Sequence, residues 1–227
     1  VNAVSRRHAE VARAMWQPLF PGRALDAVPI THVTNGVHVP TWLRGPMRAL
    51  LDRHLGAGWL SRADQAATWQ PVSDIPASEL WTARCAARGQ LVDMITQRST
   101  AHRLSRGDPM DYAEAARTGF DPGRLTIGFA RRLATYKRLH LLALLPERAI
   151  ALLGGERPIQ FIFAGKAHPA DADAKEIVRQ LFTLKRSPSV AGRAAFLEDY
   201  DMATAGQLVA GCDVWVNLPR PPLEASG

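Results

Sequence analysis

From residue 124 to the end, the chain alternates short apolar segments of strand periodicity with segments of helical periodicity. In residues 124–130, Leu125, Ile127 and Phe129 fall on one side, as expected of a strand. Further strands are predicted at 158–164, 194–197 and 212–216, and helices at 139–153, 174–185 and 203–209. Strands that alternate with helices favour a parallel sheet with crossover helices. The sequence therefore predicts a Rossmann-like α/β domain.

The first 123 residues show helical rather than strand periodicity. Residues 1–16 predict an amphipathic helix, 47–55 a short helix and 76–104 a longer one. Asn35-Gly36 is a turn signal, and residues 107–123 are rich enough in proline and glycine to predict a connection. A mostly helical region is therefore expected before the sheet.

Composition limits the classes of function. With 47% hydrophobic and 22% charged residues in 227, the chain is globular rather than disordered. Cys85 and Cys212 fit no disulfide or metal pattern, so we expect no metal site and a reducing cytoplasm. No signal peptide is visible and no segment is apolar enough to span a membrane, so no membrane partner is expected.

The net charge of +7 suits an anionic substrate, a nucleic acid or a membrane surface. The arginines are spread along the chain, and no basic run with interleaved aromatic residues occurs. Nucleic-acid binding is therefore the weaker interpretation.

Polar residues follow each predicted strand, where parallel sheets bind their ligands. After the four strands come, in turn, Arg131, Arg132, Tyr136, Lys137 and Arg138; Gly165, Lys166 and His168; Glu198, Asp199 and Tyr200; and Asn217, Arg220 and Glu224. Arg132 and Lys137 combine a planar fork with a point charge, which suits a phosphate, although a solvated helix start has the same pattern. Glu224, close to Ser226 and Gly227, suits sugar hydroxyls, although a plain helix cap also fits.

In their order along the chain, these motifs resemble those of the glycogen and maltodextrin phosphorylase family. The matching segments are residues 1–6 with His8, 34–37 with Trp42, Arg131-Arg132, 136–138, 165–167, 196–200 and 224–227. Together they cover nearly the whole chain. The amino-acid sequences of residues 35–42 and 217–222 resemble those of the shorter bacterial branch of the family.

The resemblance implies an α-glucan phosphorylase, a hexosyltransferase of the two-domain GT-B type. Such an enzyme cleaves α-1,4-glucan with inorganic phosphate, giving glucose 1-phosphate with retained configuration. It depends on pyridoxal phosphate, whose own phosphate acts as a proton relay. The implied roles are catalysis for Arg132 and Lys137, sugar binding for Asn35, Tyr136, Glu224, Ser226 and Gly227, and cofactor binding for Trp42, Arg131 and Tyr200.

The resemblance also implies three parts: residues 1–34 as the tail of an amino-terminal catalytic domain, 35–123 as a helical connecting region, and 124–227 as part of a carboxyl-terminal Rossmann-like domain. The cofactor lysine is expected beyond Gly227, so we expect an internal piece that is inactive alone. Three residues depart from the animal-type pattern. Asp201 replaces an arginine, which weakens the cofactor-phosphate assignment; Ala134 replaces a histidine; and Arg131 replaces a lysine but keeps its charge.

Two other functions stay open. One is a nucleotide-sugar-dependent glycogen or starch synthase, against which residues 224–227 argue. The other is a non-catalytic sugar- or nucleic-acid-binding module. Lys185 is predicted on an outer helix, where its replacement is expected to change the activity little.

Overall fold

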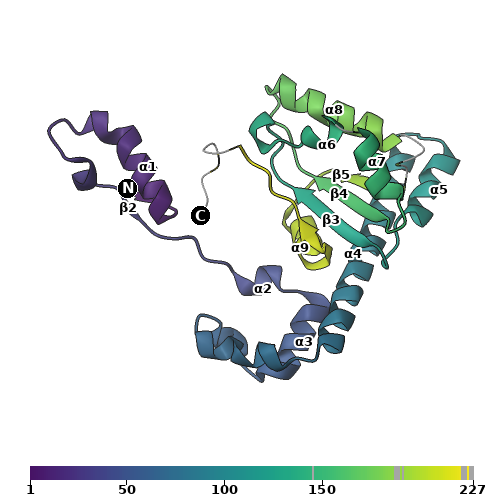
Figure 1. Ribbon diagram of the computed structural model, residues 1–227, viewed down its shortest axis with the longest axis horizontal. Coiled ribbons are helices and arrows are strands. Elements are labelled where there is room, and N and C mark those ends of the chain that lie inside the picture. Colours follow the sequence, from purple (N-terminus) through teal and green to yellow (C-terminus); the bar gives the residue numbers. More distant parts are fainter. Residues whose placement is uncertain (145, 187–189, 191, 221–223, 225–227) are drawn as a thin grey trace. The chain divides into compact units, whose positions relative to one another are not determined.

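The computed structural model describes residues 1–144, 146–186, 190, 192–220 and 224. These residues form two compact units (Figure 1). Val39–Leu218 makes the larger unit, and Val1–His38 with the described residues from Pro219 onward makes the smaller one. The helical region and the sheet thus belong to the same unit. The division into three parts stays a prediction.

The larger unit is built on a four-stranded parallel sheet, as predicted. Its strands are β3 (Leu125–Ala130), β4 (Ile159–Ala164), β5 (Ala194–Leu197) and β6 (Val214–Trp215), arranged in the order β5-β4-β3-β6. β3 pairs with β4 over its whole length, with Leu125 opposite Ile159 and Ala130 opposite Ala164. The number, the parallel pairing and the approximate bounds of these strands were therefore predicted correctly.

Helices cover both faces of this sheet (Figure 1). Alternate strand residues pack on opposite sides, as the period of two requires. One apolar cluster joins the sheet to α7 (Pro146–Gly154) and α8 (Ala172–Arg186), with Phe129 and Leu181 among its buried residues. The other joins it to α4 (Ala77–Ser105) and α9 (Met202–Gly211) through Ile95 and Leu208. This layered α/β arrangement confirms the predicted fold class.

The helices before the sheet are α2 (Val39–Trp42), α3 (Gly45–Leu55), α4 and α5 (Met110–Gly119). The prediction of a connection over residues 107–123 was wrong, because α5 occupies most of it. Gly107, at φ 71°, ends the preceding helix, and Pro109 then caps a new one. Ala113 and Ala116 of α5 are buried and α5 packs against α4. This tertiary packing outweighs the helix-breaking tendency of the glycine and proline residues in the segment. The helix predicted over 139–153 corresponds to α6 (Leu141–Leu144) and α7, on either side of residue 145, which lies outside the described residues.

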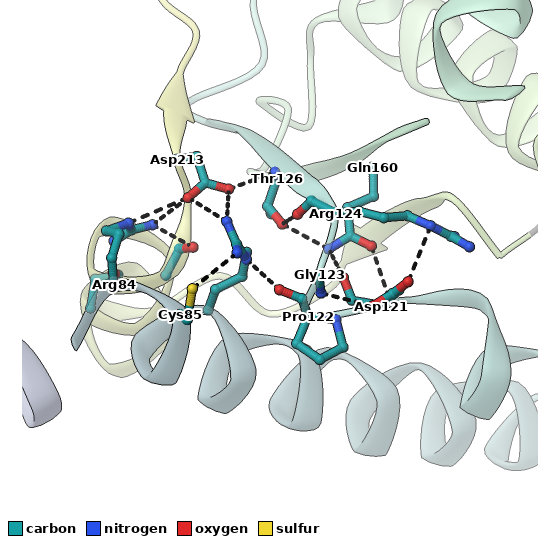
Figure 2. A network of polar contacts seen from close by, with 12 residues as sticks. Arg84, Cys85, Asp121, Pro122, Gly123, Arg124, Thr126, Gln160 and Asp213 are labelled. Atoms are coloured by element: carbon teal, nitrogen blue, oxygen red, sulfur yellow. Dashed lines mark hydrogen bonds and ion pairs between the residues drawn. The ribbon is translucent and has the colours of Figure 1, made fainter. Parts of the chain in front are cut away.

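A buried polar network holds α4 against the amino-terminal edge of the sheet (Figure 2). Asp213, just before β6, accepts hydrogen bonds from Arg84 Nη2 at 3.1 Å, from Arg88 Nη1 at 2.9 Å and from the Thr126 amide at 2.8 Å. The side chain of Gln160 on β4 donates to Thr126 Oγ1 at 2.7 Å. These bonds connect α4, β3, β4 and the start of β6. The residues at the carboxyl-terminal edge of the sheet take no part in them.

The smaller unit pairs β1 (Asn2–Ala3) with β2 (Thr31–His32) in parallel, beside α1 (Arg6–Trp16). Ser5 caps α1 by accepting a hydrogen bond from the His8 amide at 3.2 Å. The helix predicted over 1–16 therefore begins five residues later, because its first residues join a strand pair. Two short 3-10 helices, Gln17–Leu19 and Leu25–Ala27, connect α1 to β2.

Candidate functional site

The order of the strands predicts a ligand site at the carboxyl ends of β3 and β6. The chain passes from β3 to β4 and β5 on one side, then returns across β3 to form β6 on the other. In open α/β sheets, ligands bind where the strand order reverses in this way. The segments that follow the two strands, residues 131–138 and 217–218, are therefore the first place to look for a site.

Two arginines join these segments. Arg131 donates a hydrogen bond to Asn217 Oδ1, and Arg138 Nε donates to the Leu218 carbonyl at 2.7 Å. Arg138 has a φ of 56°, a left-handed conformation that is uncommon for a residue other than glycine. Such backbone outliers persist where the surrounding structure holds them, and they gather at functional sites. Where the strand order reverses, hydrogen bonds thus hold the loop after β3 against the loop after β6.

Arg132, Tyr136 and Lys137 lie together within the loop after β3. Arg132 is exposed, and its Nη2 lies 3.4 Å from the Tyr136 hydroxyl. Lys137 is only 6% exposed, and its Nζ lies 4.7 Å from the centre of the Tyr136 ring. The hydrogen bond from Arg132 lowers the pKa of Tyr136, and Lys137 adds to this against the opposite effect of partial burial. Two cations therefore flank one phenol, and cations of these two types are suited to contact an anion.

The loop after β4 lies against this cluster. Leu133 N donates to the Lys166 carbonyl at 3.0 Å, and Gly165 has a φ of 148° that side chains rarely adopt. Lys166 itself is exposed, with its Nζ 3.9 Å from Asp199 Oδ1. No described contact ties its amine to the Arg132 cluster.

Tyr200 follows β5 at the same edge of the sheet, two strands from β3. It packs against the apolar cluster beneath α4 and α9, and burial raises its pKa. Asp201, the residue that departs from the family pattern, caps α9 by accepting a hydrogen bond from the Thr204 amide at 2.8 Å. That role was missed in the sequence, although an aspartate directly before an apolar helix is the usual signal of an N-cap.

The structure brings together only part of the predicted site. Arg131, Arg132, Tyr136, Lys137 and Tyr200 all lie at the carboxyl edge of the sheet. Trp42 belongs to the same unit, at the end of α2, which packs against α9. Asn35 and Glu224 belong to the smaller unit, where the Asn35 amide donates to the Val4 carbonyl at 3.1 Å. Ser226 and Gly227 lie outside the described residues.

Lys185 lies near the end of α8, where it is only 9% exposed, and its amine lies 5.2 Å from the centre of the Phe182 ring. That its replacement changes the activity little stays a prediction. Lys175 of α8 is exposed, so its replacement is a suitable control for substitutions of the buried lysines.

Among the described residues, no helix has the length and apolar content that a membrane crossing requires.

Comparison with known proteins finds similarity along the whole chain. The chain is 41% identical to a glycogen phosphorylase of Aquifex aeolicus, 40% identical to a maltodextrin phosphorylase of Thermococcus litoralis and 44% identical to a glycogen phosphorylase of Mycobacterium tuberculosis. Each alignment covers 100% of this chain but only 32%, 27% and 26% of the respective relative. No protein-family model matches the chain. The chain thus spans about a third or less of the length of these relatives.

Proposed function

We propose that this chain, which is similar over its full length to a segment of the glycogen and maltodextrin phosphorylases, forms part of the active site of an α-glucan phosphorylase. The enzyme would cleave α-1,4-glucan with inorganic phosphate and release glucose 1-phosphate. The observation that carries the proposal is the cluster of Arg132, Tyr136 and Lys137 at the reversal point of the sheet, together with the similarity.

Arg132 and Lys137 would bind the substrate phosphate. Arg132 is exposed and offers a fork of donors, while Lys137 is a buried cation behind it. Fixed positive groups stabilise negative charge most when they need no rearrangement, and the hydrogen bonds from Arg131 and Arg138 to Asn217 and Leu218, after β6, hold this loop in place. Lys137 would therefore set the potential of the site, and Arg132 would make the directional contacts.

Tyr136 would hold a sugar hydroxyl beside the phosphate. Its phenol has a lowered pKa because Arg132 donates to its oxygen, so its O–H is a stronger hydrogen-bond donor to a sugar hydroxyl. Asn35, Glu224, Ser226 and Gly227 are proposed to bind the remaining hydroxyls, as the resemblance implies.

The residues at this edge also suit the phosphate of pyridoxal phosphate. Arg131 and Tyr200 supply a guanidinium and a phenol after β3 and β5, on either side of the glycine loop that follows β4. These are the donor types that hold a phosphate ester. Asp201 is turned into the cap of α9, where it accepts from Thr204. When bound, the cofactor would supply a proton through its own phosphate; Trp42 is proposed to lie near it.

The remaining expectations stay proposals of the same kind. They are a two-domain GT-B architecture with residues 1–34, 35–123 and 124–227 as its parts, a cytoplasmic location, and no activity for this chain without the rest of the enzyme. A catalytic constellation works only when all its parts are held together.

The test is phosphorolysis by the whole enzyme that contains this chain. We expect release of glucose 1-phosphate from maltooligosaccharide that depends on inorganic phosphate and on pyridoxal phosphate. Transfer of glucose from a nucleotide sugar without any phosphorolysis would instead support the synthase. Salt-sensitive DNA binding with no reaction on maltooligosaccharide would support the non-catalytic module.

A further inference from the structure

A second pocket, lined by charged side chains, lies beside the edge strand β5, away from the reversal point between β3 and β6. It has a volume of about 440 Å³ and lies between the ends of α4 and α8. Its lining residues are Arg106, Asp108, Tyr112, Phe182, Lys185 and Glu198. The proposed reaction uses none of these side chains.

The amine of Lys185 is the most unusual group in this pocket. The residue is 91% buried, and among the described residues its amine has no hydrogen-bond or ion-pair partner, only the Phe182 ring at 5.2 Å. Burial first, and then Arg103 and Arg106, lower its pKa to about 8, against the opposite effects of Glu198 and Asp108. The amine therefore still carries its charge at pH 7, without an anion to neutralise it.

Arg103 of α4 adds a second incompletely paired cation. It is 4% exposed, and its guanidinium lies 3.9 Å from the centre of the Tyr112 ring, which lines the pocket. Its Nη1 donates to the Tyr112 carbonyl, but its buried Nε has no partner within the described part of the chain. A buried donor without an acceptor costs about 1–3 kcal/mol, so this neighbourhood gains from any acceptor that enters it.

The two carboxylates of the pocket are already engaged. Arg106 Nη1 pairs with Glu198, and Arg106 Nη2 lies 3.3 Å from Asp108. The side chain of Arg98 also donates to the main-chain carbonyl of Glu198, at 3.0 Å. With Arg103 and Lys185 added, the cations around the pocket outnumber its two carboxylates.

We propose that this pocket binds a small phosphate-type oxyanion, held chiefly by Lys185. An entering dianion would accept a hydrogen bond from the buried Lys185 amine, and a hydrogen bond between two charged groups is the strongest kind available there. The excess of cations around the pocket would also attract it. The cavity has room for a phosphate group with its water or with a small ester substituent. Such a site would bind phosphate whatever reaction takes place at the carboxyl edge of the sheet.

The four lysines of the chain allow each anion site to be observed separately by NMR of lysine labelled with ¹³C at Cε. In the unmodified chain we expect the pKa of Lys185 to rise on titration with inorganic phosphate, saturating with a Kd of about 1 mM. The Lys137 signal reports on the Arg132 cluster in the same spectrum, so the two sites are separated. Lys175→Met, on the exposed face of α8, should leave the Lys185 response unchanged, whereas Lys185→Met should weaken phosphate binding at this pocket about tenfold in calorimetry.

Two further titrations identify the source of the anion. Tighter binding of phenyl phosphate than of inorganic phosphate would indicate a phosphorylated metabolite, and the reverse order would indicate free phosphate; either order supports the site. A Lys185 pKa that does not respond to phosphate, or that responds equally to chloride at the same ionic strength, would overturn the proposal.

Discussion

A Cβ atom on Gly165 would overlap the main-chain carbonyl oxygen of Arg131. The loop after β4 is therefore held directly against the first residue after β3, at the base of the Arg132 cluster. The contact has no room for a side chain, and the glycine also has a φ of 148°. The position of Arg131 thus depends on a glycine in a neighbouring strand's loop.

Gly165→Ala should destabilise the fold by at least about 2 kcal/mol, because both the backbone conformation and the overlap oppose a methyl group. Urea unfolding measures the change. Gly89→Ala in α4 is the matched control: no atom lies within 4 Å of the added carbon, so this change should stabilise the helix by up to about 1 kcal/mol. If both variants unfolded at the same urea concentration, Gly165 would have no special role.

Asp213→Ala should cost about 3–5 kcal/mol in the free energy of unfolding, because it leaves the buried Arg88 and the half-buried Arg84 without their carboxylate. Burial raises the pKa of Asp213, but the Thr126 amide and the two arginines outweigh that effect and lower it. Glu176→Ala breaks an exposed ion pair with Arg179 and should leave the stability nearly unchanged. Equal losses in the two variants would contradict the assignment of Asp213 as the centre of the network.

Lys185→Met should stabilise the fold at neutral pH and lose that advantage as the pH rises. Burial, then Arg103 and Arg106, lower the pKa of Lys185 from 10.5 to about 8, against Glu198 and Asp108, so between these values the unfolded chain binds the extra proton. Wild-type stability therefore rises with pH in this window relative to the variant, by about 3 kcal/mol in total. Urea unfolding at pH 7 and pH 10 in phosphate-free buffer tests this; a difference between the two proteins that is independent of pH would contradict it.

Arg132→Ala should raise the pKa of Tyr136, because the hydrogen bond from Arg132 is the main cause of its lowered value. The chain has three tyrosines, so NMR of tyrosine labelled with ¹³C at Cζ resolves each titration. The pKa of Tyr200, raised by burial alone, provides the internal control and should not move. A Tyr136 titration that is the same in both proteins would show that the two side chains do not interact.

Much of the fold was predictable because strand and helix periodicities are local properties of the sequence. β3, β4 and β5 lie where the short apolar segments predicted strands, and the predicted helices between them indicated the parallel pairing. The helix α5 was not predictable from Gly107 and Pro109, because burial of Ala113 against α4 decides it. The environment of Lys185 was missed for the same reason, since β5 and α4 meet it from distant parts of the chain.

The candidate site was predictable up to the edge of the sheet on which it lies. Arg132 and Lys137 were candidates because they follow a predicted strand, and the resemblance to the phosphorylases implied roles for them. The burial of Lys137 and the bonds from Arg131 and Arg138 to residues 217–218 depend on the return of the chain to form β6. No local pattern carries that information.

The most direct test of the central claim is the rate of glucose 1-phosphate formation from maltooligosaccharide, measured at several phosphate concentrations with the whole enzyme that contains this chain. Arg132→Ala and Lys137→Ala should each lower the rate about 10²–10³-fold and weaken its dependence on phosphate, because each removes a fixed positive group from the phosphate site. Lys175→Ala, an exposed lysine on α8, should match the unaltered enzyme. If Arg132→Ala and Lys175→Ala were equally active at every phosphate concentration, the carboxyl edge of β3 would not be the phosphate site.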